Sequence, residues 1–121
     1  MIGDWLDIGP VSQIAPGNAR TLPVRGGPDA NREIAIFHTL DNQFYALVNS
    51  CPHKQGSLSQ GIVHGTVVTC PLHSWNISLK TGEALGEDKG CVPTIPLRVD
   101  AGRIYLLREA VVAAKPAVKV A

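Results

Sequence analysis

The chain has few cysteines, little net charge and no long apolar run, and each shortage excludes a class of protein. Three cysteines, an odd number, argue against the disulfide framework of a small secreted domain. Eleven basic and ten acidic residues give a formal charge of +1. No basic stripe is visible, so nucleic acid is a poor candidate partner. The longest apolar run near the C-terminus, Ala110 to Ala114, is far too short to cross a bilayer.

A secretory signal is also missing from the sequence. The first residues, MIGDWLDIGP, have neither a basic n-region nor an apolar h-region. We therefore expect a cytoplasmic protein with no membrane partner. The length of 121 residues fits one domain with a modest core. In such a protein, cysteines are more often metal ligands or catalytic thiols than disulfide partners.

Short runs rich in β-branched residues predict an all-β fold. Twelve glycines and nine prolines separate these runs, which suits many short strands and tight turns. Two hairpins are expected, one from EIAIFHTL and QFYALV at residues 33–48, the other from LRVD and RIYLL at residues 97–107. Further strands are expected at residues 5–8, 21–24, 66–69 and 75–79. Residues 109–121 form a C-terminal tail, either frayed or a short helix.

One stretch, CPHKQGSLSQGIVHGTVVTCPLH, concentrates the residues that bind metals. It holds two of the chain's three cysteines and three of its four histidines. One residue separates Cys51 from His53, and two residues separate Cys70 from His73. Each pair follows an expected strand, so each lies in a loop that leaves a strand. Two such loops side by side would bring two thiolates and two imidazoles to one centre.

Three interpretations compete for these four residues. They could be structural, although a proline after each cysteine (Pro52 and Pro71) makes two matched pairs a poor coincidence. They could form a Cys₂His₂ zinc site, but zinc fingers usually group cysteine with cysteine and histidine with histidine. In a Rieske [2Fe–2S] centre, one iron holds two cysteines and the other two histidines. Each loop must then supply one ligand to each iron, as C-x-H and C-x-x-H do, and this favours the third interpretation.

The two boxes CPHKQG and CPLHSW resemble the cluster-binding boxes of Rieske-type ferredoxins. Residues 48–107 resemble the small subunit of the siroheme-dependent NAD(P)H nitrite reductase, most of all in LSQGIVHGTVVTCPLHSW, LKTGEALG and GCVPTIPLRV. The resemblance implies a three-sheet antiparallel domain over residues 1–108, with an inserted cluster-binding subdomain at about residues 48–79. It implies a Rieske-type [2Fe–2S] cluster held by Cys51, His53, Cys70 and His73.

The sequence departs from the Rieske proteins of the respiratory chain, which carry an extra cysteine in each box. Here Gly56 and Leu72 occupy those positions. The hydroxyl residues that follow the second box in that group are replaced by Trp75 and Ile77. A quinol-oxidising protein is therefore not expected. Cys91 has no cysteine left to pair with if the other two bind iron, and we expect it to be a buried apolar thiol.

Four other residues of possible interest have ordinary explanations. We expect His38 to be a surface or hairpin residue and His64 to be a turn residue. Gly61, taken alone, is expected to serve an ordinary turn. Trp75 either covers the cluster or belongs to the core.

The resemblance implies electron transfer, because a Rieske cluster has no open coordination position for a substrate. No nucleophile–base pair or phosphate-binding loop is visible, so no independent catalysis is expected. The expected role is the electron-transfer subunit of NAD(P)H-dependent nitrite reductase, beside a large flavin and siroheme subunit that binds nitrite and NAD(P)H. The alternatives are a standalone Rieske ferredoxin that serves an aromatic-ring dioxygenase and, from another class, a zinc-binding interaction module.

Overall fold

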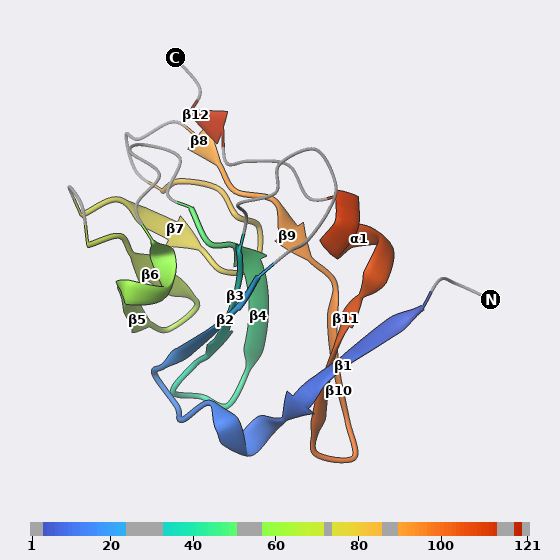
Figure 1. The fold of residues 1–121 in the computed structure, drawn as a ribbon. Helices are drawn as coiled ribbons and strands as arrows, with labels where there is room; N and C mark the ends of the chain where they lie inside the picture. Colours follow the sequence, from blue (N-terminus) through green and yellow to red (C-terminus); the bar gives the residue numbers. More distant parts are fainter. Residues whose placement is uncertain are drawn as a thin grey trace.

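The regular secondary structure of the described residues is mostly antiparallel β-strand. The computed structural model describes residues 4–23, 33–50, 57–71, 74–85, 90–113 and 118–119. Within these residues there are one four-stranded sheet, two three-stranded sheets and one two-stranded pair. In the view of Figure 1 the four-stranded sheet lies between the two three-stranded sheets. The expectation of an all-β, three-sheet antiparallel fold is confirmed.

The central sheet has the strand order β2-β3-β4-β9. Its strands are β2 (Ala19–Pro23), β3 (Glu33–His38), β4 (Phe44–Val48) and β9 (Thr94–Ile95). The expected β3–β4 hairpin is present, and its turn contains Asn42 with a φ of 66°. Asparagine tolerates this left-handed conformation. Five of the six residues of β3 are buried, because β3 has a paired neighbour on each edge and packed side chains on both faces.

A second sheet joins the two ends of the domain. It contains β1 (Trp5–Pro10), β10 (Leu97–Asp100) and β11 (Arg103–Leu107) in the order β1-β11-β10. The expected β10–β11 hairpin is confirmed, and both residues of its two-residue turn have a positive φ, 52° at Ala101 and 76° at Gly102. Such turns match the natural twist of paired strands.

The third sheet belongs to the stretch that carries the cysteine–histidine pairs. It contains β5 (Ile62–His64), β6 (Val67–Thr69) and β7 (Asn76–Ser78). β6 and β7 match two expected strands, whereas β5 was not expected. His64 is the last residue of β5, so its expected position in a turn is wrong, although the turn begins directly after it at Gly65.

The remaining elements are short. The described residues include two 3₁₀-helices, η1 (Val11–Gln13) and η2 (Leu58–Gln60). The helix α1 (Arg108–Ala113) begins the C-terminal tail, as one of the two alternatives expected. After it, β12 (Val118–Lys119) pairs with β8 (Gly90–Cys91). Within the described ranges, no helix has the length and apolar character needed to span a membrane.

The core draws its apolar side chains from all three of the larger sheets. Its fully buried members include Phe37, Leu47, Val68, Ile77, Ile104 and Leu106. Trp75 is partly buried and packs against this core, in line with one of its two expected roles.

His38 and Cys91 differ from the expectations in their burial. His38 belongs to the β3–β4 hairpin, as one of its two expected positions, but it is only 6% exposed, so the surface position is wrong. Its Nδ1 lies 2.7 Å from the carbonyl oxygen of Ile14, and its Nε2 lies 2.7 Å from Oδ1 of Asn42. These partners satisfy a buried polar ring. Cys91 is exposed rather than buried, because the two-residue strand β8 leaves its side chain in solvent.

Candidate metal centre

Cys70 is the one predicted ligand whose surroundings the structure describes. Cys51, His53 and His73 lie outside the described residues. Cys70 follows β6 directly and is only 1% exposed. Its backbone N–H donates to the carbonyl oxygen of Trp75 at 2.7 Å. The short segment between Cys70 and Trp75 is therefore closed at its base, which holds a buried thiol in a fixed place.

The strands on either side of this segment reinforce the closure. Thr69 of β6 pairs with Asn76 of β7, so the chain enters and leaves the segment through neighbouring strands. Ser74 has a φ of 58°, in the left-handed region that reverses the chain direction sharply. The second predicted ligand segment thus begins and ends at the end of the β6–β7 hairpin.

The first predicted ligand segment is fixed at both ends by Asn49. This residue follows β4, and its backbone N–H donates to the carbonyl oxygen of Glu33 at 2.8 Å. Its side-chain Oδ1 accepts a hydrogen bond of 2.8 Å from the backbone N–H of Ser59. Asn49 precedes the Cys51–Gly56 stretch and Ser59 follows it. The bond therefore spans the segment and holds its two ends together.

Gly61 brings the two predicted ligand segments into one region. A β-carbon on Gly61 would lie 2.3 Å from the carbonyl oxygen of Thr69 and 3.1 Å from that of Leu58. The chain that leaves the first segment thus lies directly against the strand that leads into Cys70. The backbone N–H of Gly61 donates to the carbonyl oxygen of Leu58 at 2.9 Å and closes the turn of η2, so the expected turn is confirmed. Gly61 also permits a close backbone approach, which the residue type alone does not reveal.

This arrangement suits the group that the sequence predicts. The described thiol is buried, and both predicted ligand segments are fixed at their bases by hydrogen bonds. A cluster bridging two loops needs ligands that are held in place from outside the cluster. Within the described ranges, no group of three or more His, Cys, Asp or Glu residues comes together.

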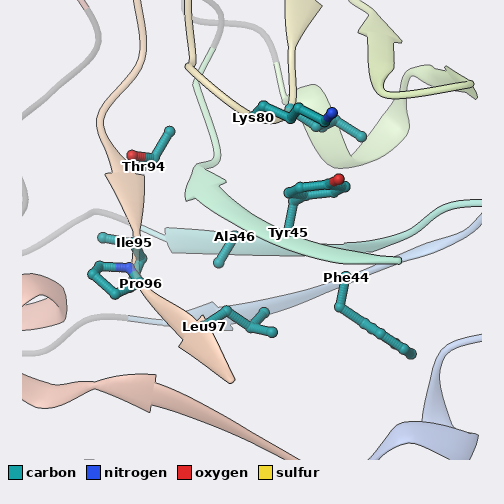
Figure 2. Close-up of a pocket in the computed structure, with 9 residues that line it drawn as sticks. Phe44, Tyr45, Ala46, Lys80, Thr94, Ile95, Pro96 and Leu97 are labelled. Carbon is teal, nitrogen blue, oxygen red and sulfur yellow. The ribbon is translucent and has the colours of Figure 1, made fainter. Parts of the chain in front are cut away.

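A separate cavity of about 280 Å³ lies between β4, β9 and the loop after β7. Figure 2 shows the side chains of Tyr45 and Lys80 at one side of it and Ile95 and Leu97 at another. Its lining contains no Cys, His, Asp or Glu. The cavity therefore offers no donor set for a metal and is distinct from the predicted centre.

Comparison with protein families gives a match that covers most of the chain. The family model described as the Rieske [2Fe–2S] domain matches residues 4–96. This match confirms the predicted cofactor, a Rieske-type [2Fe–2S] cluster, and speaks against the zinc interpretation.

Sequence relatives are ferredoxin components of dioxygenase systems. The ferredoxin subunit of 3-phenylpropionate/cinnamic acid dioxygenase from Photorhabdus laumondii is 36% identical over 103 residues, which is 79% of this chain and 87% of the relative. The ferredoxin component of the naphthalene 1,2-dioxygenase/salicylate 5-hydroxylase systems of a Ralstonia species is 29% identical over 115 residues, or 90% of this chain and 100% of the relative.

Solved structures with the same fold include proteins of two systems. A Mycobacterium tuberculosis protein assigned as an NADH-dependent nitrite reductase small subunit aligns with a TM-score of 0.73 and 26% identity, over 89% of this chain and 97% of that one. A chain from the complex of reduced oxygenase and oxidised ferredoxin in carbazole 1,9a-dioxygenase aligns with a TM-score of 0.72 and 25% identity, over 92% and 95%.

Proposed function

This chain belongs to the Rieske [2Fe–2S] domain family, and we propose that it is the electron-transfer small subunit of an NAD(P)H-dependent nitrite reductase. The proposed cluster ligands are Cys51, His53, Cys70 and His73. The proposed partner is a large flavin and siroheme subunit, which binds nitrite and NAD(P)H. The proposed domain covers residues 1–108, with its cluster-binding subdomain at about 48–79, and its proposed location is the cytoplasm.

The observation that carries the nitrite reductase assignment is the resemblance of two stretches, LKTGEALG and GCVPTIPLRV, to that subunit, beside the likeness to the Mycobacterium tuberculosis protein assigned as a nitrite reductase small subunit. The backbone N–H of Val92 donates to the carbonyl oxygen of Gly82 at 2.7 Å, and that of Ala84 donates to Gly90 at 3.0 Å. A β-carbon on Gly82 would lie 2.0 Å from the carbonyl oxygen of Val92. Residues of the two stretches therefore pack against each other.

A second candidate function is supported by the sequence relatives. Dioxygenase ferredoxins share the fold and are up to 36% identical among the relatives described. The candidate is a ferredoxin that passes electrons to the oxygenase component of an aromatic-ring dioxygenase. Both candidates use the same cluster chemistry and differ only in the partner.

The chain's own contribution to electron transfer in this proposal is to hold the cluster ligands. When bound, the cluster carries one electron at a time and has no free coordination position. Cys70 is buried at a closed loop base, and Asn49 clamps the other predicted segment. A substrate reaction therefore belongs to the partner in this proposal.

The partner decides between the two candidates. The tagged chain is recovered from its own cells after growth on nitrate, and nitrite-dependent oxidation of NADH and NADPH is assayed. We expect a large flavin and siroheme subunit to co-purify and the activity to fall when Cys70→Ser replaces the normal chain. Capture of an oxygenase component, with no effect on nitrite reduction, would exclude the nitrite reductase assignment and favour the second candidate.

A further inference from the structure

A row of three polar side chains crosses the sheet next to Cys70. Nε2 of His64 lies 2.7 Å from Oγ1 of Thr69, and Oγ1 of Thr69 donates to Oδ1 of Asn76 at 2.6 Å. The row thus links one residue from each of β5, β6 and β7. We infer that the His64–Thr69–Asn76 row positions the second ligand segment and slows the loss of the cluster from it.

The direction of the hydrogen bonds makes Thr69 the centre of the row. A hydroxyl group has one proton to donate, and that of Thr69 goes to the carboxamide oxygen of Asn76. The oxygen of Thr69 must then accept from His64, so Nε2 of the imidazole carries the proton. Each bond of the row polarises the next one. Removal of the Thr69 hydroxyl therefore breaks both bonds at once.

The location of Thr69 connects the row to the predicted ligands. Thr69 immediately precedes Cys70, and its pairing partner Asn76 follows the ligand segment. Its carbonyl oxygen is the atom against which Gly61 packs. The residue that leads into Cys70 is thus held by its side chain on one side and by its main chain on another.

Short strands explain why this sheet needs side-chain bonds. β5, β6 and β7 have three residues each. Val63, Val68 and Ile77 fill the buried face, and the row occupies the opposite, solvent-facing side. The named strands end at Thr69 and Asn76, and one further backbone bond, from the N–H of Cys70 to the carbonyl oxygen of Trp75, closes the ligand segment. The row adds side-chain hydrogen bonds beside this closure.

The first experiment removes the hydroxyl group of Thr69 and leaves its shape. It rests on the proposed function, since it takes Cys70 and His73 as ligands. Release of iron to a chelator and the EPR g-values are measured for the wild type, Thr69→Val and Thr69→Ser. We expect Thr69→Val to release iron about fivefold faster than the wild type and to have shifted g-values. Since a tenfold change in rate corresponds to 1.4 kcal/mol, a fivefold change corresponds to about 1 kcal/mol, the size of one hydrogen bond. Thr69→Ser keeps the hydroxyl and should match the wild type.

A matched control separates the row from a general effect of threonine loss. Thr94→Val removes an exposed threonine hydroxyl from β9, in another sheet, and should leave iron release unchanged. Equal release from Thr69→Val and the wild type, or failure of Thr69→Ser to restore the normal rate, would overturn the inference. A wild-type protein without a Rieske EPR signal would instead overturn the proposed function, so the two failures are distinguishable.

Coupling within the row gives a second measurement. His64→Ala removes one of the two bonds and should accelerate iron release about twofold. Because both bonds pass through Thr69, the double variant with His64→Ala and Thr69→Val should match Thr69→Val alone. If the two substitutions act independently, their accelerations of iron release multiply in the double variant. That result would show that the three residues do not act as a row.

Discussion

The carbonyl oxygen of Thr69 lies 2.3 Å from the position that a β-carbon on Gly61 would occupy. Only glycine allows the two backbones to approach so closely. The contact joins the end of the first predicted ligand segment to the strand that leads into Cys70. It is therefore the point where the spacing between the two segments is set.

Gly61→Ala should disturb the centre more than the rest of the fold. The new methyl group meets a backbone atom, which must move, and overpacking of this kind costs about 1–3 kcal/mol. We expect lower iron content per chain and a lower unfolding temperature. Gly65→Asn is the control, because nothing lies within 4 Å of its β-carbon position and asparagine tolerates its positive φ. Normal iron content in Gly61→Ala would refute this role.

Cysteine substitutions should separate a ligand from an exposed thiol. Cys70→Ala should abolish the red-brown colour and loosen the loops, because metal binding and local folding are coupled. Cys91→Ser should keep the cluster with little loss of stability, since Cys91 is exposed. Iron analysis and visible spectra check both variants. Complete cluster loss in Cys91→Ser would mean that a ligand is misassigned.

Asn49→Ala should loosen the first predicted ligand segment. It removes the acceptor for the Ser59 N–H, and a lost hydrogen bond of this kind costs about 1 kcal/mol. We expect a lower urea midpoint and faster iron release. Glu33→Gln is the control, because it alters only the exposed 3.2 Å bond between Asn49 and Glu33. The same acceleration in both variants would contradict a clamp at Ser59.

The reduction potential should be low for a Rieske cluster. Rieske potentials span roughly −150 to +300 mV, and donors to the cluster sulfurs raise them. Ile77 stands where respiratory-chain proteins carry a hydroxyl residue, and its side chain is fully buried in the core. No hydroxyl donates from this position. We expect a midpoint below about +100 mV in a redox titration at neutral pH, and a higher value would show this reasoning to be wrong.

The ion pair between Asp7 and Arg103 should make a small acid-sensitive contribution to stability. The side-chain hydrogen bond from Arg103 lowers the pKa of Asp7 below the ordinary value of an aspartate side chain. Because the pKa is lower in the folded state, the ionised carboxylate stabilises the protein at pH values above the pKa of the unfolded state. This stabilisation is lost as the pH falls through the pKa of the folded state. The difference in unfolding temperature between wild type and Asp7→Asn should therefore be present at neutral pH and vanish at low pH. A difference that persists in strong acid would exclude the ion pair as its cause.

The hairpins could be predicted from sequence because their signals are local. Asp41-Asn42 and Ala101-Gly102 lie within the turns that they specify. The burial of His38 could not be predicted in this way. Its carbonyl partner, Ile14, lies 24 positions away, and only the folded chain brings the two together. The strand β5 was missed because its three residues are too few for a visible alternation.

The candidate site, too, could be predicted from the sequence only in part. The spacing of Cys51, His53, Cys70 and His73 predicted the cofactor, since ligand chemistry is carried by residue type. The supports of the site, at Asn49 and Gly61, gave no signal of their own. Asparagine and glycine are common in loops, and their partners at Ser59 and Thr69 become apparent only when the segments are packed.

The pairing of β1 with β11 has a consequence for how the chain folds. Trp5 pairs with Leu107, so this sheet closes a loop that contains nearly the whole domain. Closing a long loop costs chain entropy before any contact is gained, and distant pairings slow folding. The β5–β6–β7 hairpins need only neighbouring residues. We therefore expect the hairpins next to the predicted ligands to form early, and the two ends of the domain to meet last.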